Sequence, residues 1–374
     1  MRFIEAGFER FSIPEPFEKM EVLKHLEKIG RVCYKSEDKI TDESCIKYLN
    51  NIRDRKHWAM LEHYIFAFYI PRSFYDEFYE IMMEHCDDYD FANAVSFVKL
   101  SNIKGSDDLD KQYILSASAT AINYLWDTAA YNNPGVISCF HYICKFMLDN
   151  YSEITKMPEG FYFPNDFEMH DGVKLISRSE MKSMPRNIRL IHDFMTTKFI
   201  VDRGVTHEAV RHRPASWAQE STRYVNYGKK GCTYILPEWL SDHDKEVLLS
   251  DEMLEDYLKD QYFMASNPHN LSYRTLDYLD SIIHSSNIYE DLVSSDATNI
   301  KEDKWVPQQA RSVLSHSTKA ELVMTARLGE MKHFFDMRAE GHAHPQMREV
   351  AIPLLADCIS TDHIIFEDQQ KYLV

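Results

Sequence analysis

Apolar positions near the amino end of the chain recur at roughly helical spacing. From Met20 to Ile29 every third residue is apolar, close to the period of an α-helix, so we predict a helix over 18–29. It is the first of two helices joined by a turn within the first sixty residues. Tyr64 to Ile70 is aromatic and β-branched and is followed by Pro71, which predicts a strand that ends there.

The region 72–190 is rich in Tyr, Phe, Met and Asp and is interrupted by polar, Gly- and Pro-containing breaks. This composition predicts helices joined by loops. Within it, 113–127 resembles 322–336, because both begin with small residues and end with aromatic ones. We interpret the pair as two buried helices of similar composition and predict no internal repeat.

Two later segments also follow a helical pattern. Asp242 to Asp260 is acidic with spaced leucines, which predicts a solvated helix packed by one face. A second stripe of apolar residues predicts a core helix, which Gly341 would end. On that helix Arg327 and Arg338 would lie roughly 20° apart around the axis. The apolar members of that stripe are Met324, Leu328, Met331 and Phe335.

Composition narrows the class of protein. Of 374 residues, 44% are hydrophobic, and 42 Lys and Arg face 59 Asp and Glu, a net charge of −17. This excludes a disordered chain and argues against nucleic-acid or anionic-membrane partners. No run of eighteen apolar residues exists, the first residues have no apolar signal core, and the seven scattered cysteines form no C-x-x-C pair. We therefore expect a reduced, cytoplasmic protein.

The stretch Arg203 to Lys230 stands out because six basic and two acidic residues give it a local charge of +4. We predict a helix over 207–213, with Thr206 as its N-cap and Pro214 beyond its end. Arginines at its end, followed by hydroxyl and amide side chains, suit a phosphate. The alternative reading is an ordinary charged surface.

Metal and hydrolase chemistry have little support in the sequence. His342 and His344 could form a metal pair, but no third ligand lies at zinc spacing, so we predict no metal. The motifs G-x-S-x-G, H-E-x-x-H and G-x-G-x-x-G are also missing from the sequence. Any dinucleotide must then be held without the usual βαβ unit.

The segment RHRPASWAQES, from Arg211 to Ser221, resembles the R-H-R, seven residues, Ser signature of the flavin-dependent thymidylate synthases, the ThyX family. Similar pieces cover about 18–70, 194–240 and 305–357. The resemblance implies one α+β catalytic domain over 1–374, a mixed sheet with flanking helices, and a mostly helical insertion at about 72–190.

The same resemblance implies an activity. Members of the family methylate dUMP to dTMP, with methylenetetrahydrofolate as the carbon donor and reduced FAD as the hydride source, and NADPH usually re-reduces the flavin. They are homotetramers with shared active sites. The compartment would be the cytoplasm, or the host cytoplasm if the gene is viral.

Residue roles follow by position in the motifs. Arg338 would be catalytic, because a permanently charged guanidinium favours ionisation at the pyrimidine N3. The predicted dUMP contacts are Glu208, Arg211, Gln219, Glu220, Ser221, Thr222, Arg223 and Arg311, with 219–223 offered by a neighbouring subunit. The predicted FAD contacts are His57, Glu62, Arg211, His212, Arg213, Gln219, His333 and His342.

Departures from the family pattern gather on the flavin side. Arg327 stands where Asn is usual, and Gly329 replaces an arginine that ordinarily meets flavin. Arg327 would either restore the lost charge or fill the space. Two alternatives therefore stay open: a flavoenzyme acting on another pyrimidine nucleotide, by dCMP methyl or hydroxymethyl transfer, and a non-catalytic nucleotide-binding relative.

Overall fold

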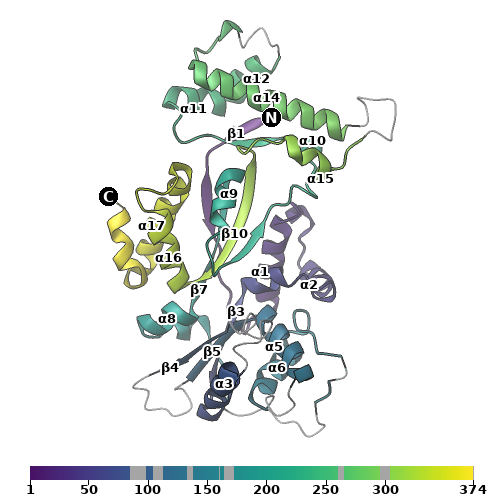
Figure 1. The fold of residues 1–374 in the computed structure, drawn as a ribbon, viewed down its shortest axis with the longest axis vertical. Coiled ribbons are helices and arrows are strands. Elements are labelled where there is room, and N and C mark those ends of the chain that lie inside the picture. Colours follow the sequence, from purple (N-terminus) through teal and green to yellow (C-terminus); the bar gives the residue numbers. More distant parts are fainter. Residues whose placement is uncertain are drawn as a thin grey trace.

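The computed structural model combines helices with antiparallel sheets (Figure 1), which confirms the α+β class. In the part of the chain that the structure describes, no helix is both long and apolar enough to cross a bilayer. The described residues are 1–84, 98–103, 113–132, 138–159, 161–163, 172–259, 265–294 and 304–373.

The first four-stranded sheet, here called the catalytic sheet, gathers strands from both ends of the chain. Its order is β2 (Gly7–Arg10), β7 (Phe194–Asp202), β10 (Lys319–Arg327) and β8 (Ser216–Gln219), antiparallel throughout. The two central strands are almost wholly buried. Helices follow them directly: α9 (Arg203–Ala209) after β7, and α16 (Leu328–Arg338) after β10. The carboxyl end adds α17 (Pro345–Phe366) and η6 (Glu367–Tyr372).

A second four-stranded sheet, here called the insertion sheet, adds short strands to the region 72–190, whose described residues are mostly helical. Its order is β4 (Lys99–Asn102), β5 (Tyr113–Ser118), β3 (Ile65–Ile70) and β6 (Lys174–Leu175). Three of these strands come from 72–190, where β-branched and aromatic residues were too dispersed to predict a sheet. The helices of this region are α3 (Arg72–Glu84), α5 (Ala119–Asn132), α6 (Ser138–Asn150), α7 (Arg178–Ser183) and α8 (Arg186–His192).

A helical layer lies at the opposite end of the molecule from the insertion sheet (Figure 1). The pair β1 (Arg2–Ile4) and β9 (Thr233–Ile235) runs parallel beneath it. The predicted acidic helix is two helices, because Ser250 between them is extended; Asp260 is outside the described residues. The elements here are α10 (Tyr227–Lys230), α11 (Asp242–Leu249), α12 (Asp251–Lys259), α14 (Tyr273–Val293), α15 (Pro307–Ala310) and η5 (Arg311–Val313).

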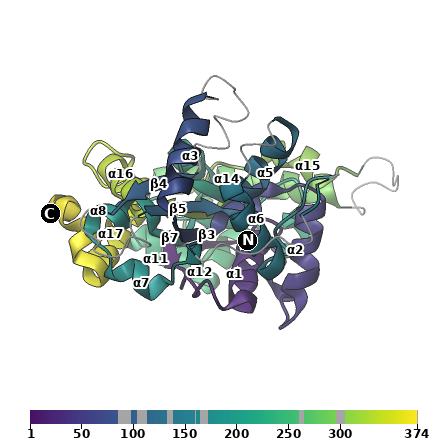
Figure 2. The same cartoon turned by 90° about the horizontal axis from the view of Figure 1, so that it is seen from below.

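The amino-terminal predictions are confirmed. The helix α1 (Lys19–Val32) is followed by η1 (Glu37–Lys39), α2 (Ser44–Asp54) and η2 (Trp58–His63), and β3 ends just before Pro71. In both views, α16, α17 and the carboxyl end lie on one side of the sheet strands, and α1 and α2 lie on the other (Figures 1 and 2).

Four local predictions are wrong. The segments 113–127 and 322–336 are each a strand followed by a helix, not two helices. The predicted stripe crosses that change, so Arg327 and Arg338 are the two ends of α16 and share no helical face. α16 also ends at Arg338, before Gly341. The helix predicted over 207–213 is instead α9. Its N-cap is Asp202, whose Oδ1 accepts a hydrogen bond from the Val205 amide at 2.7 Å, and the helix ends at Ala209.

Buried polar contacts join the two sheets, and we call this set the sheet junction. The Arg327 guanidinium donates through Nη1 to Ser116 Oγ (2.7 Å) and Ile191 O (2.9 Å), and through Nη2 to Ser116 O (3.1 Å). Nδ1 of His192 lies 2.8 Å from Ser116 Oγ, and Nδ1 of His63 lies 2.8 Å from Thr325 Oγ1. Arg327 therefore fills space between the sheets, one of its two predicted alternatives.

Candidate functional site

Arg338 and Glu208 meet although they are far apart in sequence. Arg338 Nη2 donates to the backbone oxygen of Glu208 at 2.9 Å, and its Nη1 lies 3.9 Å from the Glu208 carboxylate. The Arg338 Nε is buried and has no acceptor among the described residues. The packing of α16 beside α9 thus brings together a predicted catalytic residue and a predicted dUMP contact, with a donor left unused.

His212, in the turn after α9, contacts α16. Its ring lies 5.1 Å from that of His333, and its Nε2 is 3.2 Å from Glu330 O. Burial, with a contribution from the neighbouring His333, lowers the pKa of His212 to about 4, so its ring is neutral at pH 7. Arg211 and Arg213 flank it and are both exposed. This arrangement leaves two guanidinium groups free to meet an anion.

Glu62 occupies a second position predicted for flavin. It lies on η2, and burial raises the pKa of its carboxyl, opposed by a hydrogen bond with Ser216. Both residues line a cavity of about 50 Å³ at the end of β10. His57, at the start of η2, is exposed.

The segment 219–223 follows β8 and lies against the chain near Cys33. Gln219 donates to Thr206 Oγ1 at 2.8 Å, and the Ser221 amide donates to Cys33 O at 2.9 Å. Glu220 is buried, with Lys319 Nζ and Tyr227 OH at 2.8 and 2.9 Å. These partners give Glu220 a structural position; its predicted contact with dUMP stays a prediction.

The remaining predicted residues lie at the surface or are enclosed. Thr222 is buried, whereas Arg223, Arg311 and His342 are exposed. Among the described residues, no hydrogen bond or ion pair joins 220–223 to Arg338 or Glu208. A single chain therefore presents the predicted nucleotide contacts as two separate groups.

The donor set fits a flavin dinucleotide. Exposed guanidinium groups at Arg211 and Arg213 suit a diphosphate, and the unused Nε of Arg338 suits an anionic ring. In the described part of the chain, no three or more His, Cys, Asp or Glu residues gather as metal ligands do.

Gly329 is required by close packing. A Cβ built at this position would lie 2.8 Å from Leu190 O of α8. A larger side chain would need α16 to move away from α8. The arginine usual in the family therefore has no room here.

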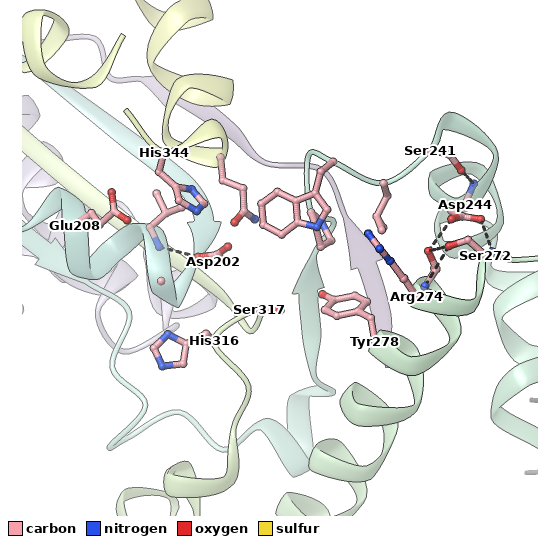
Figure 3. Close-up of a pocket in the computed structure, with 17 residues that line it drawn as sticks. Asp202, Glu208, Ser241, Asp244, Ser272, Arg274, Tyr278, His316, Ser317 and His344 are labelled. Carbon is pink, nitrogen blue, oxygen red and sulfur yellow. Dashed lines mark hydrogen bonds between the residues drawn. The ribbon is translucent and has the colours of Figure 1, made fainter. Parts of the chain in front are cut away.

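A larger cavity of about 550 Å³ lies between α9 and the helical layer (Figure 3). Glu208 is the one predicted site residue that lines it. Figure 3 shows Asp202, Glu208 and His344 across the cavity from Arg274 and Asp244. Sequence reasoning missed these linings, because they come from separate elements with no common spacing; His344 was considered only as a metal ligand. The other aromatic or ionisable lining residues include Trp239, Tyr278 and His316.

Comparison with known proteins gives a family match over part of the chain. Residues 190–360 match the family model described as thymidylate synthase complementing protein. The flavin-dependent thymidylate synthase of Corynebacterium efficiens is 27% identical over 170 residues, 46% of this chain and 59% of that protein. The Mycolicibacterium gilvum enzyme of the same name is 28% identical over 168 residues, 45% and 58% of the two chains. This chain thus covers about six tenths of the length of these relatives.

Two solved structures are similar at lower identity. Flavin-dependent thymidylate synthase ThyX from Helicobacter pylori, complexed with FAD and dUMP, is 18% identical, with a TM-score of 0.31 over 47% of this chain and 72% of that one. A UMP/dUMP methylase, PolB from Streptomyces cacaoi, is 17% identical, with a TM-score of 0.34 over 48% and 74%.

The family match spans β7 to α17, which includes the R-H-R signature, the Arg338–Glu208 contact and both central strands of the catalytic sheet. Over these residues the chain is similar to the flavin-dependent thymidylate synthases.

Proposed function

We propose that this protein is a flavin-dependent thymidylate synthase that methylates dUMP to dTMP. Methylenetetrahydrofolate would supply the carbon, and NADPH would reduce the cofactor. FAD, when bound, supplies the hydride. The proposal is supported by the family match and by a site whose donors suit an anionic nucleotide and a dinucleotide cofactor.

The observation that carries the proposal is the setting of Arg338. Its Nη2 is fixed by the Glu208 carbonyl, so the guanidinium is held in place before a ligand arrives. Its Nε is buried and has no acceptor among the described residues. A guanidinium does not deprotonate near pH 7, and it can therefore stabilise negative charge that develops at the pyrimidine N3.

The cysteines favour a mechanism without an enzyme nucleophile. Burial raises the pKa of both the Cys33 and the Cys358 thiol to about 12. Thiols with such pKa values hold almost no thiolate at pH 7, and a thiolate is the species that attacks a pyrimidine ring. Cys45, Cys144 and Cys232 are also buried.

A site shared between subunits explains the two separate groups of nucleotide contacts. Glu208, Arg211 and Arg338 would hold the base in one protomer. Ser221 and Arg223 would reach the phosphate of a nucleotide bound to a neighbour, as in a homotetramer. The exposure of Arg211, Arg223 and Arg311 agrees with a role at such an interface.

The first test replaces the catalytic arginine. We expect Arg338→Ala to reduce turnover of dUMP at least a hundredfold, the loss typical when a group that stabilises transition-state charge is removed. The visible spectrum of bound FAD should persist. Arg55→Ala, at an exposed arginine after α2, serves as a control with unchanged turnover. Full turnover by Arg338→Ala, with the protein folded, would contradict the assigned role.

The second test addresses cofactor and acceptor together. Purified protein should take up FAD, and dUMP should then change the flavin spectrum. Parallel turnover assays with dUMP and dCMP decide the acceptor, since transfer to dCMP alone would replace the proposed substrate. Protein that stays colourless with added FAD yet binds dUMP would instead be a non-catalytic nucleotide binder.

A further inference from the structure

We propose that Lys99, which the insertion contributes, binds the imide edge of a planar ring in the small cavity beside Glu62. A cyclic imide presents carbonyl, N–H and carbonyl in a row, and both uracil and the isoalloxazine of FAD carry one. The inference rests on the proposed function, and it assigns a cofactor contact to a segment outside the family match.

The insertion sheet places Lys99 at this cavity. Lys99 begins β4 and pairs in register with Ser116 of β5, so the two side chains lie on one face of the sheet. Ser116 is also the residue that accepts hydrogen bonds from Arg327. Lys99 and Arg327 therefore approach the cavity from the insertion sheet and the catalytic sheet, respectively, and both line it.

The two cations differ in what they can still bind. Arg327 is almost fully buried and spends its donors on Ser116 and Ile191. Lys99 is half-buried, and in the described ranges no carboxylate forms an ion pair with it. Lys319 and Lys198, on the catalytic sheet, are both paired with glutamates. A half-buried lysine without a carboxylate is thus available to a ligand.

The other lining groups complete an imide site. Lys99 and the Ser118 hydroxyl can donate to carbonyl oxygens, and Glu62, which is already hydrogen-bonded to Ser216, can also accept from the imide N–H. Burial raises the pKa of Glu62, which favours a ligand that gives this carboxyl a hydrogen-bonding partner. The cavity holds about 50 Å³. One water needs about 10–15 Å³ of such space, so the cavity has room for a few waters or the edge of a ring.

Flavin is the favoured source of the imide. The cavity is bounded by Pro214, Ala215 and Ser216, which directly follow Arg213, so the rest of a dinucleotide would lie toward the exposed arginines. The arginine usual at position 329 is excluded by the Leu190 carbonyl. Lys99 would supply the missing positive charge from a different part of the chain.

The test measures binding and reduction of the cofactor, not turnover. Lys99→Met removes the charge and keeps the length of the side chain. Lys174→Met is the matched control, on β6 of the same sheet and exposed. We expect Lys99→Met to bind oxidised FAD about tenfold more weakly than wild type and reduced FAD about a hundredfold more weakly. That tenfold difference lowers the midpoint potential by about 30 mV for a two-electron couple. Lys99→Arg should restore most of the affinity.

A second arm identifies the ring. dUMP affinity is measured with the same variants by calorimetry, with and without FAD. A tenfold loss for dUMP with FAD binding unchanged would keep the imide site and assign it to uracil. If Lys99→Met binds both ligands with unchanged affinity, or if Lys174→Met loses as much affinity, this inference is overturned while the proposed function still stands. A wild-type protein that binds neither FAD nor dUMP would overturn the proposed function with it.

Discussion

The two four-stranded sheets have similar plans but different origins in the sequence. In each, a buried central strand runs directly into a helix: β10 into α16 in the catalytic sheet, and β5 into α5 in the insertion sheet. The catalytic sheet carries the R-H-R signature and Arg338, whereas the insertion sheet carries no motif. The second sheet nevertheless lines the small cavity through Lys99 and Ser118. A region without a motif can therefore line a cavity beside residues that a motif singles out.

The sheet junction is where this comparison can be tested. Arg327 stands at the end of β10 and reaches Ser116 of β5, so one buried charge is shared by both sheets. His63 and His192 add neutral rings on either side of it. If the sheets are a single cooperative unit, damage to the junction should lower the stability of the whole protein.

The largest expected effect comes from acid. Burial lowers the pKa of His63 to about 3, and burial with the nearby Arg327 and Lys99 charges lowers that of His192 to about 3. Both groups are protonated in the unfolded chain below about pH 6.5 but stay neutral in the folded one. These two histidines therefore do not reduce the free energy of unfolding above pH 6.5, but they reduce it progressively as the pH falls toward 3. At pH 5 the two histidines together should lower the free energy of unfolding by about 4 kcal/mol.

Urea unfolding between pH 8 and pH 5 measures this loss. A single transition that moves to lower urea as the pH falls would show that the sheets unfold together. Two transitions, of which only one depends on pH, would separate the sheets. A midpoint that stays constant down to pH 5 would contradict the neutral histidines.

Arg327→Met should have the next largest effect. The change leaves Ser116 O and Ile191 O without their donor in a buried place, and we expect a loss of about 3 kcal/mol in the free energy of unfolding. Arg55→Met, at an exposed arginine, should change it by less than about 0.5 kcal/mol. Equal stability of the two variants would mean that the junction does not hold the sheets together.

Gly329→Ala should have a smaller effect, confined to the catalytic sheet and α8. Its Cβ would lie 2.8 Å from Leu190 O, so α16 must shift, at a cost of about 1–3 kcal/mol. Gly341→Ala meets no atom within 4 Å and should be nearly neutral. Thermal unfolding of the pair checks this, and a Gly329→Ala variant as stable as Gly341→Ala would show that the contact relaxes freely.

How far the sequence predicts the structure differs between the two sheets. Periodicity predicts α1 and β3, and the resemblance to the ThyX family points to Glu208, His212, His333 and Arg338. The structure brings Arg338 to Glu208 and His333 to His212. The sequence pattern does not predict β4, β5 or β6. These short strands are stabilised by pairing with distant residues and not by local propensity. The change from strand to helix at Arg327 is not predicted either, because the buried end of β10 continues the apolar pattern of α16.

The pairing of β2 with β7 and of β1 with β9 also governs when the protein can fold. The strands of the insertion sheet lie within 65–175, so that sheet can form while the ribosome is still at work. The first ten residues must wait for β7 and β9, and the catalytic sheet closes only after Arg327 emerges. At about 5–20 residues per second, the 225 residues from Arg10 to Ile235 take roughly 10–45 s to make. During that interval the amino-terminal strands have exposed edges, and a chaperone that shields them would raise the yield of folded protein more than one that acts on the insertion.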